Sequence, residues 1–296
     1  MEIFRGIWPA LVTPSNADNT VNTESLCALI DYLIDKEVDG FYVGGTTGEG
    51  IFMPVSQRKL LAETALRHIN GRVPVILHVG AISIDDAIDM AQHAKEQGAV
   101  GISSIIPPMY TSLNTIVPYY QQLAASVGNL PFIAYILNPT LDSVIFMQQL
   151  MNIPNLAGTK YTGPNMYEFR QILNLGAGKW TMFSGMDEQC VYAAMMGATG
   201  AIGSTINIMP GVYKKIHAYV QAGEITEAQS LQVRANRVTE TMIRSGFSGA
   251  LKALLSELVG QAMGEPRLPN LVFLEQQKET LKQALAETDF EELTAM

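Results

Sequence analysis

Short apolar segments recur along the chain with amphipathic segments between them, and this alternation limits the fold more than any other feature. Most of the short segments are apolar at nearly every position, which is typical of parallel strands buried on both faces. The predicted strands are residues 6–14, 40–46, 74–80, 100–108, 131–137, 156–162, 180–186 and 200–205.

The segments between the predicted strands have the apolar spacing of helices, for example 23–38, 56–69 and 83–98. We expect these three helices to begin at residues that cap well, namely Thr23, Ser56 and Ser83. Eight strand–helix units within about 205 residues indicate a closed parallel barrel rather than an open sheet. The predicted fold class is therefore α/β, a (β/α)₈ TIM barrel.

The strand pattern stops near residue 211, and the remaining segments are typical of helices. We therefore assign residues 1–210 to the (β/α)₈ catalytic barrel. Residues 211–296 are assigned to barrel-closing and C-terminal helices of the same structural domain. In such barrels the chemistry lies at the C-terminal ends of the strands, where candidate residues are sought.

Composition excludes several classes of function. The chain has 28 Asp and Glu against 19 Lys and Arg, so a broad basic face for nucleic acid or an anionic membrane is not expected. No run of about 18 apolar residues indicates a membrane span. The two cysteines, Cys27 and Cys190, have no disulfide or zinc spacing, and the four histidines have no metal spacing. We expect a soluble, cytoplasmic protein without a metal site.

Lys160 is the most unusual polar residue, because it lies among apolar and small residues near the end of the sixth predicted strand. Apolar surroundings disfavour an ammonium and favour the neutral amine, which is a nucleophile. The structural alternative is a lysine that pairs with a buried carboxylate or extends to solvent at the rim.

Two further features follow strands on the same side of the barrel. GGTTGEG (44–50) has glycines, the hydroxyls of Thr46 and Thr47, and free N–H groups that suit a carboxylate, although it is equally typical of an ordinary turn. Tyr135 ends the fifth predicted strand, where its phenol beside Thr46 is suited to proton transfer, or simply to packing.

Polar residues also follow the seventh and eighth predicted strands. Asp187 and Glu188 are suited to capping the next helix and to binding hydroxyl groups, and these two functions are compatible. Ser204 and Thr205 end the eighth strand and are candidate donors to a bound polyol.

The ordered combination of GGTTGE, Tyr135 and Lys160 resembles the N-acetylneuraminate lyase / dihydrodipicolinate synthase family of class I aldolases, over essentially the whole chain. The resemblance implies a Schiff base on Lys160 and a proton relay through Tyr135. It also implies that Thr46 and Thr47 hold the carboxylate of pyruvate, and that no cofactor is needed.

Within this family the sequence is most similar to the sialic acid lyase branch. The resemblance assigns Thr162, Gly185, Asp187, Glu188 and Ser204 to the sugar hydroxyls. Leu141 stands where the dihydrodipicolinate synthase branch has an arginine for a second carboxylate. Without that arginine, such a substrate loses a charge-assisted hydrogen bond worth roughly 1.5–3 kcal/mol.

The sequence also departs from the family pattern. The segment after Tyr135 is one residue longer than the usual motif, and only Tyr110 remains of two adjacent tyrosines after the fourth strand. In relatives this tyrosine belongs to the relay and lies at a subunit contact, so Tyr110 is a further catalytic candidate. These departures affect the substrate pocket more than the chemistry.

The predicted function is reversible cleavage of N-acetylneuraminate to pyruvate and N-acetylmannosamine by a Schiff-base lyase. The predicted partners are a small-molecule 2-keto acid and further copies of the chain, as a homotetramer. One alternative is an aldolase of the same family that acts on 2-keto-3-deoxy sugar acids or a related 2-keto acid. Another is a non-catalytic barrel that binds a keto acid.

Overall fold

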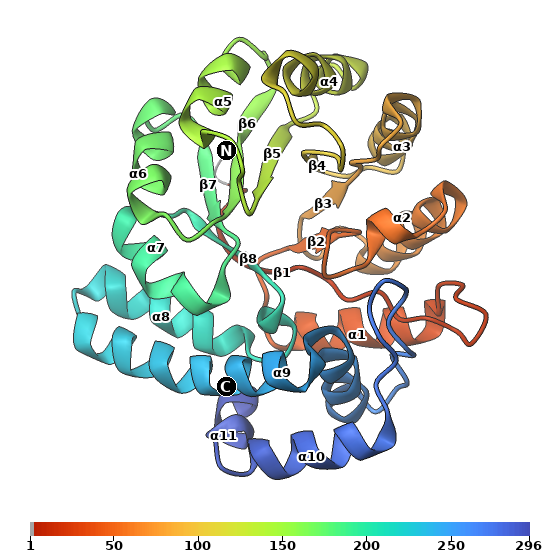
Figure 1. Ribbon diagram of the computed structural model, residues 1–296, viewed down its shortest axis with the longest axis vertical. Coiled ribbons are helices and arrows are strands. Elements are labelled where there is room, and N and C mark those ends of the chain that lie inside the picture. Colours follow the sequence, from red (N-terminus) through yellow and green to blue (C-terminus); the bar gives the residue numbers. More distant parts are fainter. Residues whose placement is uncertain (1–2) are drawn as a thin grey trace.

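The computed structural model describes residues 3–296 and has eight parallel strands surrounded by helices (Figure 1). The strands are β1 (Gly6–Pro9), β2 (Phe41–Val43), β3 (Val75–His78), β4 (Gly101–Ile105), β5 (Phe132–Leu137), β6 (Leu156–Thr162), β7 (Thr181–Ser184) and β8 (Gly200–Gly203). The helices α1–α8 of the barrel are Thr23–Asp35, Val55–Ile69, Ile84–Glu96, Leu113–Ser126, Ser143–Leu150, Met166–Leu175, Cys190–Met196 and Pro210–Ala222.

The strands are paired in the order β1-β8-β7-β6-β5-β4-β3-β2. A parallel bridge between Ala10 and Tyr42 joins the two ends of this sheet, and Leu11 N–H donates to the Tyr42 carbonyl at 2.9 Å. The predicted (β/α)₈ barrel is therefore confirmed, and each observed strand lies within a predicted one.

Apolar residues form two clusters on the two sides of the strands. One lies among the strands and includes Trp8, Tyr42, Ile133, Tyr135 and Phe183. The larger cluster lies between the strands and the surrounding helices. Burial of both strand faces explains why the strand segments are apolar rather than alternating.

Two of the three predicted capping residues are wrong. Helix α1 is capped by Asn22, whose side chain accepts from Ser25 N–H, and Thr23 is its first helical residue. Helix α2 begins at Val55 after Pro54, ahead of Ser56, without a side-chain cap. Ser83 does cap α3, because its hydroxyl accepts from Asp86 N–H. Asparagine and threonine both cap helices, so the sequence alone does not discriminate well between the neighbours Asn22 and Thr23.

The chain after the barrel is helical, with α9 (Ile225–Val259), α10 (Glu275–Leu285) and α11 (Phe290–Ala295). Helix α9 is interrupted at Gly246, whose φ of 102° is not helical. Helix α10 packs against α9, and α11 packs against α8 and α9. Among residues 3–296, no helix combines the length and apolar character that crossing a membrane requires.

Candidate active site

Lys160 lies on β6 against two aromatic rings, one from the neighbouring strand β5 and one from β2. Its residue is 4% exposed, and its Nζ lies 4.2 Å from the ring centroid of Tyr135 and 4.8 Å from that of Tyr42. Strand pairing sets Lys160 directly opposite Tyr135. Within the described part of the chain Lys160 has no carboxylate within salt-bridge distance, which disfavours the structural alternative of a buried ion pair. The two ring faces stabilise a positive charge at the nitrogen.

The turn after β2 carries two hydroxyl groups, those of Thr46 and Thr47, which contact side chains from other parts of the barrel. Thr46 Oγ1 lies 3.4 Å from the Tyr135 hydroxyl, at the long end of hydrogen-bond distance. Thr47 Oγ1 lies 2.7 Å from Ser204 Oγ, so the turn after β2 is joined to the segment after β8. The fold thus brings together residues that are 89 and 157 positions apart in the sequence.

Asp187 follows β7 and is buried, with one carboxylate oxygen satisfied and one not. Its Oδ2 accepts hydrogen bonds from the N–H and the hydroxyl of Thr205, both at 2.7 Å. Its Oδ1 has no partner among the described residues. Burial, followed by the charge of Glu188, raises the pKa of Asp187 to about 6, although Thr205 lowers it in part. The carboxylate is therefore ionised above about pH 6.

Helix α9 holds this turn from outside the barrel. Gln232 Nε2 donates to the Asp187 carbonyl at 2.9 Å, and its Oε1 accepts from Val191 N–H at 2.9 Å. Asn236 Nδ2 donates to the Glu188 carbonyl at 3.1 Å. The backbone of Glu188 is thus held by α9, and its side chain is half-buried.

Thr162 and Gly185 lie in close contact beside Lys160. A Cβ atom at Gly185 would lie 1.8 Å from Thr162 Oγ1 and 3.0 Å from Lys160 Cε, so only glycine fits there. The hydroxyl of Thr162 is buried and has no hydrogen-bond partner in the described residues. Thr162 Oγ1 and Asp187 Oδ1 are therefore two buried polar atoms without a hydrogen-bond partner among the described residues.

Two residues near the lysine, Tyr42 and His78, were not predicted from the sequence as site residues. Tyr42 forms one aromatic face, and its hydroxyl donates to Ser103 at 2.9 Å. His78 accepts from Ile105 N–H at 3.1 Å, and burial, then the charges of Arg58 and Lys160, hold its pKa well below the usual value. An inward position on a predicted strand is the signal that could have found Tyr42 and His78.

Tyr110 is not brought into contact with the other candidates within this chain. Its hydroxyl donates to the Ile82 carbonyl at 3.2 Å, and its ring packs edge-on against Tyr119. Among residues 3–296, no hydrogen bond joins Tyr110 to Tyr135 or Thr46.

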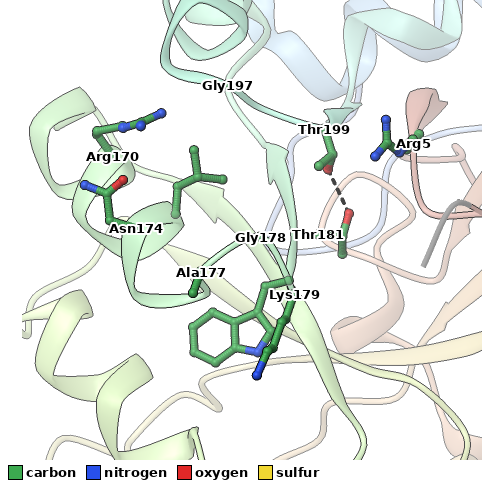
Figure 2. Close-up of a pocket in the computed structure, with 11 residues that line it drawn as sticks. Arg5, Arg170, Asn174, Ala177, Gly178, Lys179, Thr181, Gly197 and Thr199 are labelled. Carbon is green, nitrogen blue, oxygen red and sulfur yellow. Dashed lines mark hydrogen bonds between the residues drawn. The ribbon is translucent and has the colours of Figure 1, made fainter.

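A separate hollow lies near the other ends of the strands (Figure 2). It has a volume of about 520 Å³ and is lined by residues that include Arg5, Arg170, Lys179 and Trp180. None of the candidate residues lines it. Because Arg5 precedes β1 and Trp180 precedes β7, this hollow is at the N-terminal ends of strands, where residues usually serve stability rather than catalysis.

The fold and the lysine-centred site define a lyase of the class I pyruvate aldolase type. The chain belongs to the dihydrodipicolinate synthetase family, whose model matches residues 3–288.

Individual relatives have names more specific than that of the family. An N-acetylneuraminate lyase of Rhizobium meliloti is 33% identical over 288 residues, which are 96% of this chain and 95% of that protein. The structure of Proteus mirabilis N-acetylneuraminate lyase has a TM-score of 0.91 at 30% identity and covers 97% of this chain and 99% of its own. A catalytic lysine mutant of Ruminococcus gnavus sialic acid aldolase has a TM-score of 0.91 at 27% identity, covering 97% and 96%.

Proposed function

We propose that this protein is a Schiff-base aldolase that reversibly cleaves N-acetylneuraminate to pyruvate and N-acetylmannosamine, with Lys160 as the nucleophile. The observation that carries the proposal is the burial of Lys160 against the rings of Tyr42 and Tyr135. The names of the Rhizobium meliloti and Proteus mirabilis relatives support the substrate. The Ruminococcus gnavus mutant supports a catalytic lysine in this fold.

The reaction begins when neutral Lys160 Nζ attacks the 2-keto carbon of the substrate. Loss of water from the carbinolamine gives a protonated imine, and the phenol of Tyr135, 3.4 Å from Thr46 Oγ1, is suited to move the protons of these steps. The ring faces of Tyr42 and Tyr135 stabilise the positive charge of the imine.

The imine then accepts the electron pair of the C3–C4 bond of the substrate. A base removes the proton of the C4 hydroxyl, the bond breaks, and the sugar leaves as an aldehyde. The enamine left on Lys160 gains a proton at C3, and hydrolysis of the resulting imine releases pyruvate. The steps use only the amine, the hydroxyl groups and water, so we propose that the enzyme needs no metal or organic cofactor.

The two ends of the substrate fit different parts of the site. Thr46, Thr47 and the N–H groups of their turn are suited to the carboxylate. The unpaired Asp187 Oδ1 and Thr162 hydroxyl are suited to the hydroxyl groups of the open-chain sugar, because binding would supply their missing partners. Gly185, Glu188 and Ser204 complete this proposed sugar region.

A homotetramer is part of the proposal and bears on Tyr110. The tyrosine lies away from the relay of its own chain, so a relay role for Tyr110 requires a subunit contact. Light scattering tests the assembly; a monomer with full activity would exclude that role.

We also propose a cytoplasmic location, which suits the two free cysteines.

Borohydride reduction in the presence of pyruvate tests the central step. We expect one added pyruvate-derived mass per chain, located at Lys160 by peptide mapping, and none in Lys160→Met. A modification at another lysine, or no modification, would refute the mechanism and favour a barrel that only binds a keto acid. Cleavage assays with N-acetylneuraminate and 2-keto-3-deoxygluconate then identify the sugar, and a preference for the latter would overturn the proposed substrate.

A further inference from the structure

Glu49 ends the GGTTGE turn and lies in an unusual environment. It is 2% exposed, and its φ of 57° is in the left-handed region, which non-glycine residues seldom adopt. Its N–H donates to the Thr46 carbonyl at 3.0 Å, so its backbone is part of the turn that carries Thr46 and Thr47. A displacement of the Glu49 side chain would therefore shift the backbone of the turn, and with it Thr46 and Thr47.

Among residues 3–296, the hydrogen-bond donors to this carboxylate all come from the chain after the barrel. Lys252 Nζ, on α9, donates to Oε2 at 3.0 Å. Arg267 donates twice, from its N–H to Oε1 at 2.9 Å and from Nη1 to Oε2 at 3.3 Å. Asn270 Nδ2 adds a weaker contact at 3.4 Å. One carboxylate thus joins the turn to residues more than 200 positions later in the sequence.

The charges of this cluster are buried together. The side chains of Lys252 and Arg267 are 4% and 6% exposed, and that of Glu49 is 2% exposed. Removing one member of a buried ion cluster leaves the charges of the others unpaired in the interior. The cluster therefore strongly favours a single geometry.

The segment that carries Arg267 is also anchored independently of Glu49. Ser15 N–H donates to the Met263 carbonyl at 3.0 Å, and Ser15 Oγ donates to the Glu265 carbonyl at 2.9 Å. A Cβ atom at Gly264 would lie 2.0 Å from the Ser15 carbonyl oxygen, which shows how closely these backbones approach. The C-terminal region is therefore a fixed support against which Glu49 is held.

We propose that Glu49 is a positioning residue, and that Lys252 and Arg267 act through it to hold Thr46 and Thr47 where they bind the substrate carboxylate. This inference rests on the proposed function and extends it to residues of the C-terminal helices. Glu49 itself does not contact the substrate. Disrupting the cluster therefore weakens binding of the keto acid while the chemistry at Lys160 continues.

The test combines steady-state kinetics with hydrogen exchange in Glu49→Gln, Lys252→Met and the double variant. We expect each single variant to raise KM for the keto acid about 10- to 100-fold, the scale of lost hydrogen bonds to a charged group. We expect kcat to fall by a smaller factor than KM rises, because Thr46 also lies beside the Tyr135 hydroxyl. Because both residues act through one contact, the double variant should have nearly the KM of the more affected single variant.

The matched control is Lys282→Met, which removes an ion pair with Glu257 (2.8 Å) elsewhere on the C-terminal helices. It should leave KM unchanged. Amide exchange in residues 44–50 should accelerate by about tenfold or more in Lys252→Met and not in the control.

The possible outcomes distinguish the proposed function from the proposed positioning role of Glu49. If wild-type protein does not react with pyruvate, the proposed function fails, while exchange in residues 44–50 still decides whether the cluster holds the turn. Unchanged exchange together with unchanged KM in Lys252→Met would overturn the inference, as would effects that add fully in the double variant. If Glu49→Gln does not fold, Lys252→Met alone carries the test.

Discussion

Replacing Asp187 with asparagine should change how the stability of this protein depends on pH. The pKa of Asp187 is raised from 3.8 to about 6 in the folded protein, chiefly by burial. The folded state therefore retains a proton on this residue between about pH 4 and pH 6, where the unfolded chain has lost it. The contribution of Asp187 to stability is greatest below about pH 4 and is lost as the pH rises through about 6.

The size of the effect follows from the difference between the folded and unfolded pKa. The rise from 3.8 to about 6 corresponds to about 3 kcal/mol, an order-of-magnitude value for one buried carboxyl group. The quantity to compare is the difference between the free energies of unfolding of wild type and Asp187→Asn at each pH. Asparagine cannot ionise, and its oxygen can still accept from both Thr205 donors. The variant should therefore gain about 3 kcal/mol relative to wild type as the pH rises from about 4 to about 7.5.

Urea unfolding at fixed protein concentration measures this difference. Thr205→Val is a useful companion, because it removes the hydroxyl donor to Asp187 Oδ2 and should raise the pKa of Asp187 further. A stability difference between wild type and Asp187→Asn that stays constant over the range from about pH 4 to about pH 7.5 would refute the reasoning.

Two further predictions concern catalysis. Tyr135→Phe should lower kcat by about 10²–10⁴-fold, the usual scale for a lost acid–base group, and a near-normal rate in a steady-state assay would remove the phenol from the mechanism. Gly185→Ala should abolish most cleavage activity, because the added methyl group would lie 1.8 Å from Thr162 Oγ1; an unchanged kcat/KM for the sugar substrate would contradict this placement.

The sequence predicts the barrel well because each strand and helix has its own local pattern. Burial of both faces makes a strand such as β6 apolar throughout, and Lys160 stands out against that background. Capping residues are predicted less well. Asn22 and Thr23 are both good capping residues, and the choice between them depends on which one is free to accept from Ser25 N–H.

The sequence does not reveal contacts between distant parts of the chain. Tyr42 can be assigned to a strand, but its position over Lys160 follows from closure of the barrel. Glu49 is visible as part of GGTTGE, yet Lys252 and Arg267 lie more than 200 residues later in segments without any distinctive motif. Local periodicity carries no information about such pairs.

Two ionisable groups of the site lack some of their usual partners among the described residues, and this indicates how the site is arranged. Lys160 is buried against two rings without a carboxylate within salt-bridge distance in the described residues, and Asp187 keeps one oxygen unpaired. Lys160 still lowers the pKa of Asp187, so the two charges interact without forming a direct ion pair. A direct pair would stabilise both groups and would leave neither available to a substrate. Keeping them apart destabilises the folded protein, and a keto acid whose hydroxyl groups reach Asp187 while its carbonyl reaches Lys160 would satisfy both.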